Sequence, residues 1–561
     1  MDYETAILSL LKKHVNEESE LKLEVPPNSE FGDFAFPCFG LSKVQKKSPQ
    51  LIAHDLAAKL NGMDPSLLEK VTAQGPYVNF FLNKKQLSTT VLHKIAEQKE
   101  NYGKQKEKKK IMIEFSSPNT NKPLHLGHVR NISLGDSISR IFSFLGNDVI
   151  KACLINDRGI HICKSMLAYK KWGHNKNPDK KSDFFVGDFY VLFAKKATEH
   201  PELEQEAQEM LRLWEKGDKE IVTLWKKMNA WVYEGFEETY AKLNISFDRY
   251  YYESDIYLFG KEIAQEGLKK EIFFDKEGAI VAPLQDAGLP DKVLVRSDGT
   301  TIYMTQDLFL AQKKFEEEKL DRSIYVVGSE QNLHFQQLFA ILKKLGCRWA
   351  DGCYHLSYGM VNLPEGKMKS REGTVVDADA LILELTTLAK KEIHKRHPEI
   401  EHTILENRSR QVGIAAVKFH MLRIDAVKDM VYNPKESINF EGETGPYVQY
   451  THARISSILR KYGKLPEKIS LSCLGEKERA LAALLEKFPA VIVEAASHYK
   501  PSYICRYLLD LCQELNSYYH DVPVLKAEED VKLARLCLLS CIKIVIQNGL
   551  GLLGIEAPEE M

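Results

Sequence analysis

The sequence predicts a protein of three parts: an N-terminal α/β module, a larger α/β domain built on a parallel sheet, and a C-terminal bundle of helices. Three observations lead to this prediction. The 561 residues are too many for one hydrophobic core. Strand and helix patterns alternate from Ile111 to about Val376, as in parallel sheets with crossover helices. After about residue 380 only helical periodicity remains.

The composition is that of an ordinary globular protein, with 44% hydrophobic and 28% charged residues. The formal net charge is −1, so a nucleic-acid surface would have to be a local basic patch. The densest basic run is Lys104–Lys110, and a solvated linker explains it at least as well as a contact with nucleic acid does. The ten cysteines form no Cys-x-x-Cys pair, so we expect neither structural zinc nor disulfides. With no leader-like start and no apolar run near 18 residues, we expect a cytoplasmic protein.

Residues 1 to about 105 form the predicted N-terminal module. Helices are expected from Ala6 to Leu11 and over Leu51–Leu60, because apolar residues recur there at helical spacing. Strands are expected over Leu21–Val25 and over 75–81, where exposed and buried positions should alternate.

The most informative stretch of the chain begins at the first strand of the larger domain, Ile111–Phe115. A helix with apolar residues between Ile132 and Leu145, ended by Gly146, follows it. Between the two, residues 116–131 read Ser-Ser-Pro-Asn-Thr-Asn-Lys-Pro-Leu-His-Leu-Gly-His-Val-Arg-Asn. A loop that ends a parallel strand and opens a helix binds nucleotides in such sheets, because backbone N–H groups and the helix dipole favour phosphate.

Two histidines flank Leu-Gly in this loop. Gly127 lets the backbone approach a base or a phosphate without a Cβ in the way. The imidazoles of His125 and His128 can donate hydrogen bonds to charge that develops on a phosphoryl group. His-x-Gly-His arises by chance roughly 0.03 times in a chain of this composition. Its strand–loop–helix setting therefore decides the interpretation, and the alternative is a helix start with incidental histidines.

The remaining strands of the larger domain are expected in one parallel sheet, at Val149–Ile155, Lys292–Val295, Ser323–Val327 and Tyr354–Met360. A largely helical segment rich in Lys, Glu and Trp interrupts them between about residues 165 and 260. The C-terminal part shows helical periodicity at Leu381–Leu388, Val412–Leu422, Tyr447–Leu459, Arg479–Ala495, Tyr503–Leu515 and Val531–Ile546.

The run of residues 117–131 resembles the signature of arginyl-tRNA synthetases, a class I family with a Rossmann-like catalytic domain. The resemblance extends to both ends: Phe31–Ala35 and 75–81 resemble the family's N-terminal domain, and 440–461 resemble the start of its helical anticodon-binding domain. It implies domains at 1–105, at 106–380 with an insertion at about 165–260, and at 381–561.

The resemblance also implies a pocket for arginine. Tyr303 and Asp307 stand four apart, on one face if a helix begins there. The residues that match the family's arginine site are Glu114, Asn119, Glu253, Tyr303, Asp307 and Gln331. Of these, Glu114 and Asn119 match the positions that hold the α-ammonium and the α-carboxylate.

A pocket of this kind is what a guanidinium requires. A guanidinium is a planar, permanently charged group with five donors, so a selective site must offer carboxylate acceptors in a fixed geometry. Lysine or citrulline would leave a desolvated carboxylate without its partner, and such sites discriminate by about 10⁴ or more. Without the resemblance, Asp307 reads more simply as an acid at a helix N-terminus.

A second loop, Glu365–Thr374, resembles the other class I signature, Lys-Met-Ser-Lys-Ser. Lys367 and Met368 match it, but Ser370 stands at the second lysine, and Lys122 occupies the place of the family's compensating lysine. The implied catalytic residues are His125, His128, Lys122 and Lys367, and the implied ATP-binding residues are His125, Gly127, His128, Lys367 and Met368. Without the resemblance, a solvated basic turn is an equally good interpretation of this loop.

Contact with tRNA is implied at the N-terminal module, which in the family packs against the tRNA elbow. Gln74, Tyr77 and Asn79 match positions that contact a D-loop base there. An aromatic ring with flanking amides on an open strand suits stacking on an unpaired base. Ordinary hairpin side chains are an equally good interpretation.

The implied activity is that of an arginine–tRNA ligase. Its substrates would be L-arginine, Mg-ATP and tRNA(Arg), and we expect a monomer with no metal site and no tightly bound cofactor. A nucleotidylyltransferase would share the His-x-Gly-His chemistry but would have no use for the flanking domains. A catalytically silent tRNA-binding paralogue would keep these domains but should have lost the histidines or Asp307.

Overall fold

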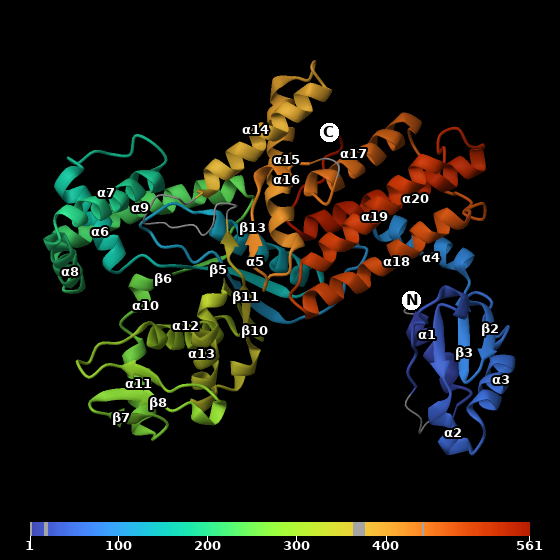
Figure 1. The fold of residues 1–561 in the computed structure, drawn as a ribbon, viewed down its shortest axis with the longest axis horizontal. Coiled ribbons are helices and arrows are strands. Elements are labelled where there is room, and N and C mark those ends of the chain that lie inside the picture. Colours follow the sequence, from blue (N-terminus) through green and yellow to red (C-terminus); the bar gives the residue numbers. More distant parts are fainter. Residues whose placement is uncertain (1–2, 16–20, 363–375, 440–441) are drawn as a thin grey trace. The chain divides into compact units, whose positions relative to one another are not determined.

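The computed structural model describes residues 3–15, 21–362, 376–439 and 442–561 (Figure 1). The chain divides into two compact units, each formed by three segments. The first consists of Met1–Tyr102, Ser457–Phe488 and Leu511–Val545, and the second of Gly103–Ser456, Pro489–Asp510 and Ile546–Met561.

A parallel sheet of order β11-β10-β4-β5-β6 forms the centre of the second unit. Its strands are β4 (Lys110–Glu114), β5 (Asp148–Ile155), β6 (Arg249–Tyr252), β10 (Arg322–Gly328) and β11 (Cys353–Tyr358). The strands predicted at 111–115, 149–155, 323–327 and 354–360 are thereby confirmed. Helix α5 (Leu126–Phe144) follows β4 and ends before Gly146 (φ +97°), as predicted.

One prediction for this sheet was wrong, and one of its strands was not predicted. The segment Lys292–Val295 is β9, but it pairs antiparallel with β8 (Ala279–Ala282), which pairs with β7 (Phe274–Lys276) in a separate sheet. Glu277 and Gly278 both have positive φ, and such a two-residue turn closes a hairpin. Strand β6 was missed because it is an edge strand with only one fully buried residue.

The insertion between β5 and β6 is helical, as predicted, although β6 itself lies within the range 165–260. Its helices, grouped together in Figure 1, are α6 (Ile160–Trp172), α7 (Ser182–Glu199), α8 (Glu202–Glu215) and α9 (Lys219–Lys242). Aromatic rings pack α6, α7 and α9 against one another. The rings of Tyr169 (α6), Phe185 (α7) and Trp231 (α9) contact one another edge to face.

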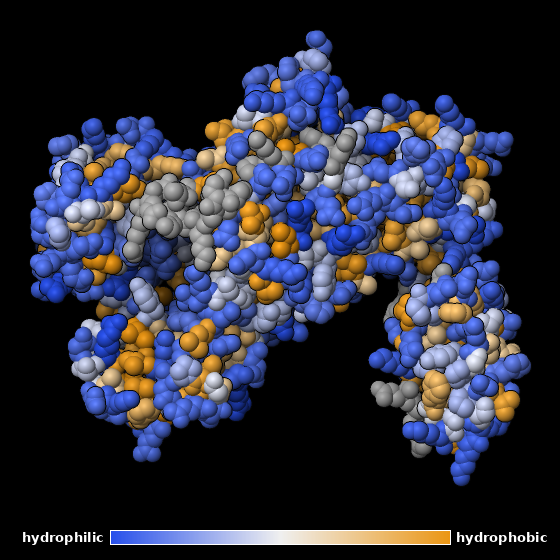
Figure 2. Space-filling model, in the orientation of Figure 1, coloured by the Kyte–Doolittle hydropathy of each residue, from blue (hydrophilic) through white to orange (hydrophobic). Residues whose placement is uncertain are grey.

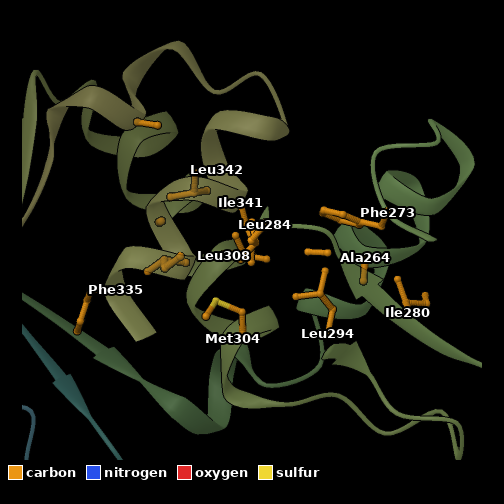
Figure 3. Close-up of a cluster of buried hydrophobic side chains, with 14 of the residues drawn as sticks. Ala264, Phe273, Ile280, Leu284, Leu294, Met304, Leu308, Phe335, Ile341 and Leu342 are labelled. Atoms are coloured by element: carbon orange, nitrogen blue, oxygen red, sulfur yellow. The ribbon is translucent and has the colours of Figure 1, made fainter. Parts of the chain in front are cut away.

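After β6 come α10 (Glu253–Ile256), α11 (Gly260–Lys269), α12 (Tyr303–Glu318) and α13 (Asn332–Lys344). One apolar core joins α11, β8, β9, α12 and α13, as Figure 3 shows for Met304 and Leu308 on α12 and for Phe335 and Leu342 on α13. This core fixes α12 and α13 relative to each other. Two short strands, β12 (Val361–Asn362) and β13 (Met430–Val431), also pair.

The C-terminal part is helical, and each predicted segment lies in a helix. The helices are α14 (Ala378–Arg396), α15 (His402–Arg423), α16 (Pro434–Ser437), α17 (Gly445–Tyr462), α18 (Glu476–Ser497), α19 (Ser502–Asp521) and α20 (Glu529–Leu552). By length and composition α20 could cross a membrane, but 56% of its most apolar window is buried, as in the core helix of a bundle. The face of the molecule in Figure 2 is mainly hydrophilic.

The N-terminal module has an antiparallel sheet of order β1-β3-β2, formed by β1 (Phe34–Pro37), β2 (Leu68–Gln74) and β3 (Tyr77–Leu82). Its helices are α1 (Tyr3–Lys12), α2 (Phe39–Gln45), α3 (Pro49–Leu60) and α4 (Lys84–Gln98). The helices expected at 6–11 and 51–60 and the strand at 75–81 are confirmed. The strand expected at 21–25 was wrong: only one bridge, Glu24 to Ala35, forms there, and Pro26 and Pro27 follow, which cannot donate to a ladder.

Candidate active site

The site lies where the order of the parallel sheet reverses. From β4 the chain passes through α5 to β5 on one side, whereas β10 pairs on the other side of β4. In such sheets a crevice opens beyond the carboxyl ends of the strands at this point. Two adjoining hollows occupy it here, of about 480 and 430 Å³. Ser117, Val327 and Gln331 line both.

The first hollow, the histidine hollow, contains His125, Gly127 and His128 at the start of α5. The N–H of Gly127 donates to Nδ1 of His125 (3.2 Å), and the N–H of His125 donates to Nδ1 of His128 (3.1 Å). The histidines thus cap their own helix, and their ring centroids are 3.9 Å apart. Because each Nδ1 accepts, a neutral ring carries its proton on Nε2.

Both rings are neutral at pH 7. Burial, together with a smaller contribution from the nearby Lys122, lowers the pKa of His125 to about 3. Burial also holds the pKa of His128 well below its usual value, with smaller contributions from His125 and Lys122. The two Nε2–H groups therefore serve as neutral donors, while Lys122, whose own pKa burial lowers, supplies a cation beside them. Lys122 is not among the described residues that line either hollow.

The spacing around Gly127 predicts a variant that loses activity without losing stability. A methyl group added at Gly127 would lie 3.1 Å from Cε1 and 3.2 Å from Nδ1 of His125, so the ring must shift. We expect Gly127→Ala to slow phosphoryl chemistry by about 10- to 100-fold, the cost of small misplacements at a reacting centre. Folding stability should stay equal or rise by up to ~1 kcal/mol, because alanine favours a helix more than glycine does.

The measurements are the rate of the phosphoryl chemistry and the thermal unfolding of the variant. The matched control is Gly551→Ala in α20, where an added methyl meets no atom within 4 Å. Equal rates for both variants would show that the position of the His125 ring does not limit the reaction.

The second hollow, the acidic hollow, brings together all six residues predicted for the arginine pocket: Glu114, Asn119, Glu253, Tyr303, Asp307 and Gln331. Helix α12 begins at Tyr303, as the sequence predicted. Met304 and Leu308 point from α12 into the apolar core of Figure 3, so the adjacent positions Tyr303 and Asp307 face the hollow.

The acidic side chains of this hollow differ in their partners. Burial raises the pKa of Glu253 to about 7, against the opposing effect of the Arg158 guanidinium 4.0 Å away. Glu114, at the end of β4, forms an ion pair with Lys314, which is 0% exposed. An α-ammonium bound at Glu114, as the sequence predicts, would therefore have to compete with Lys314. Asp307 is hydrogen-bonded to His334.

Three family models match the chain: "tRNA synthetases class I (R), catalytic domain" over residues 90–434, "DALR anticodon binding domain" over 448–561, and "Arginyl tRNA synthetase N terminal domain" over 1–82. The arginine–tRNA ligase of Treponema denticola is 48% identical, over 97% of this chain and 95% of that protein. The chain belongs to the arginyl-tRNA synthetases.

Other members are similar over their whole length. The arginine–tRNA ligase of Bacteroides thetaiotaomicron is 44% identical, over 97% of this chain and 96% of that protein. The solved arginyl-tRNA synthetase of Thermus thermophilus superposes with a TM-score of 0.85 at 30% identity, covering 100% of this chain and 99% of that one. As a class I synthetase with an anticodon-binding domain, the chain uses ATP and binds tRNA. The predicted domain boundaries near 105 and 380 stay predictions.

The N-terminal domain of this synthetase also gathers its predicted residues. Gln74, Tyr77 and Asn79 line one hollow of about 330 Å³, together with the exposed Phe31 and with Ala35. The expectation of an open strand was wrong, because β3 is the central strand and Asn79 is only 3% exposed. Tyr77 and Gln74 remain the accessible pair of the three.

Two predicted site residues lie outside this description, and three charged or polar residues that line the acidic hollow were not predicted. Lys367 and Met368 fall in 363–375, outside the described residues. Sequence reasoning missed Arg158, Lys314 and His334. Lys314 could have been found, since it is seven residues after Asp307 and shares its helix face. Nothing in the local pattern marks Arg158, which is brought to Glu253 by the fold.

Proposed function

We propose that the protein activates L-arginine with ATP and transfers the arginyl group to the terminal adenosine of tRNA(Arg). The observation that supports this proposal most is the shared wall of the two hollows, formed by Ser117, Val327 and Gln331. A guanidinium held among the acids of one hollow leaves the α-carboxylate of arginine near the phosphate-binding loop of the other. That is the arrangement that adenylate formation requires.

In the first step a carboxylate oxygen of arginine attacks the α-phosphorus of ATP in line. The bond from that phosphorus to the bridging oxygen breaks, and pyrophosphate leaves with the electron pair. The Nε2–H groups of His125 and His128 donate to the phosphoryl oxygens as charge develops, and Gly127 leaves room for the nucleotide. Lys122 and Lys367 supply positive charge.

In the second step the 2′-hydroxyl of the terminal ribose attacks the carbonyl carbon of arginyl-adenylate, and AMP leaves. Positioning drives both steps, and no covalent enzyme intermediate is involved. The described residues contain no group of three or more His, Cys, Asp or Glu that could hold a metal ion. The Mg²⁺ that accompanies ATP would therefore be held chiefly by the phosphates of the nucleotide.

Arginine-dependent exchange of pyrophosphate into ATP tests the proposal, run with and without tRNA. We expect exchange with L-arginine and none with lysine or citrulline, because either would leave Asp307 and Glu253 without a guanidinium partner. Exchange that depends on another amino acid, or no exchange under either condition, would refute the proposal. The monomeric state, the cytoplasmic location and the D-loop contact at Tyr77 stay predictions.

The raised pKa of Glu253, about 7, predicts that arginine binding releases a proton. A guanidinium pairs with the ionised carboxylate, so below pH 7 the protein must lose a proton to bind. Arginine affinity should therefore fall as the pH drops, by up to about tenfold per unit below pH 7. Titration calorimetry without ATP, in buffers of different ionisation enthalpy, counts the proton. Glu253→Gln should bind arginine more weakly at pH 8 and show no release; an unchanged release would assign the proton to another group.

A further inference from the structure

The acidic hollow contains a contact that the proposed function does not use. Nε2 of His334 lies 2.6 Å from Oδ2 of Asp307, and both side chains line the hollow. The two side chains are partly exposed, His334 by 19% and Asp307 by 31%, so both can be reached from the hollow. In the part of the chain that the structure describes, no other side chain is hydrogen-bonded to Asp307.

The two helices that carry this pair are held rigidly. Asp307 stands on α12 and His334 in the first turn of α13, and both helices pack on the apolar core of Figure 3. Phe335, the residue after His334, is buried in that core, and its ring stacks on His355 with centroids 4.3 Å apart. The imidazole of His334 is therefore anchored from the second helix, independently of the turn that presents Asp307.

This anchoring has a consequence for the carboxylate. A donor on Oδ2 restricts the rotation of the Asp307 carboxylate and leaves Oδ1 to accept from a ligand. An N–H donor on Oδ2 fixes the carboxylate in this way without occupying Oδ1. The other charged groups of the hollow are arranged differently: Glu114 is paired with Lys314, and Glu253 faces Arg158. Among the described residues that line the hollow, Asp307 is thus the acid that forms a hydrogen bond to a histidine and no ion pair with a lysine or an arginine.

We infer that His334 is a positioning residue that orients Asp307 for the guanidinium of arginine. The inference rests on the proposed function, because it assigns Asp307 to the arginine side chain. An oriented carboxylate loses less freedom when the ligand binds, so the contribution of His334 appears in arginine affinity. ATP, which is assigned to the other hollow, gains nothing from it.

Pyrophosphate exchange with five variants tests the inference. His334→Ala should raise the KM for arginine by about 10- to 100-fold, as expected for the loss of a hydrogen bond to a charged group, with the KM for ATP within about twofold. His334→Gln should recover most of the affinity, because its amide can donate from a similar position. Leu333→Ala, at the exposed neighbouring position of the same turn, should match the wild type.

The double variant Asp307→Asn/His334→Ala separates positioning from general packing. If His334 acts through Asp307, the double variant should bind arginine no more weakly than Asp307→Asn alone. Additive losses, a parallel rise in the KM for ATP, or failure of His334→Gln to recover affinity would each overturn the inference. Wild-type exchange with normal behaviour of His334→Ala would refute only the inference, whereas a wild type without arginine-dependent exchange would refute the proposed function with it.

Discussion

Asp307→Asn is expected to raise the KM for arginine by about 100-fold or more and to leave the KM for ATP within about twofold. The amide keeps the size of the carboxylate but removes its charge, and one of its two positions becomes a donor that faces the donors of the guanidinium. Loss of one partner from a desolvated charge pair costs about 2–5 kcal/mol. Asp307 lines the hollow with Glu253 and Tyr303, so Asp307→Asn leaves Glu253 to face the guanidinium without a second carboxylate.

The matched control is Glu317→Gln, which removes an exposed acid from the same helix and breaks only a surface ion pair with Lys313. Such pairs contribute about 0–1 kcal/mol, and Glu317 does not line the hollow. Thermal unfolding of both variants reports whether α12 is intact. If Asp307→Asn weakened arginine and ATP equally, Asp307 would have no special part in binding the amino acid.

The loop between β4 and α5 could be predicted from the sequence because all its determinants are local. The apolar run of β4, the helical spacing of α5 and the stop at Gly146 each lie within a few residues of what they determine. The start of α12 was predictable for the same reason, and with it the shared face of Tyr303 and Asp307.

The errors arise where pairing between distant segments decides the structure. The three apolar residues of β9 suit a parallel sheet and an antiparallel hairpin equally, and only the hairpin of β7 and β8 selects the second. Similarly, the strand at 75–81 looked open because its partners β1 and β2 have weak patterns of their own. The cations Arg158, in the loop between β5 and α6, and Lys314, in α12, escaped notice because basic residues are normally solvated.

Arg130, which the sequence analysis left without a role, carries the prediction with the largest expected effect on stability. Arg130 is 0% exposed and lies in the second turn of α5. Its guanidinium donates to the backbone carbonyls of Gly359 (2.9 Å), Met360 (3.4 Å), Asp425 (3.3 Å), Ala426 (3.0 Å) and Lys428 (2.7 Å). These carbonyls belong to the two segments that lead into β12 and β13, so one side chain holds both segments to α5.

Arg130→Met is expected to lower the free energy of unfolding of the second unit by about 3–5 kcal/mol. Methionine fills much of the space but leaves buried carbonyl oxygens without donors, and each such group costs about 1–3 kcal/mol before relaxation. Arg130→Lys should be intermediate, since an ammonium keeps the charge but has three donors where the guanidinium has five. Pyrophosphate exchange should fall with Arg130→Met, because β12 immediately precedes the loop that contains Lys367.

Tryptophan fluorescence in urea measures this effect in the right unit, because all five tryptophans lie between residues 103 and 456. The control is Arg212→Met, which removes an exposed arginine with a single surface ion pair to Glu209 and should shift the midpoint little. Equal midpoints for the two variants would mean that the segments before β12 and β13 are held by other contacts. A large shift confined to Arg130→Met would instead identify this guanidinium as the group that holds the segments before β12 and β13 to α5, a contact that local sequence patterns do not reveal.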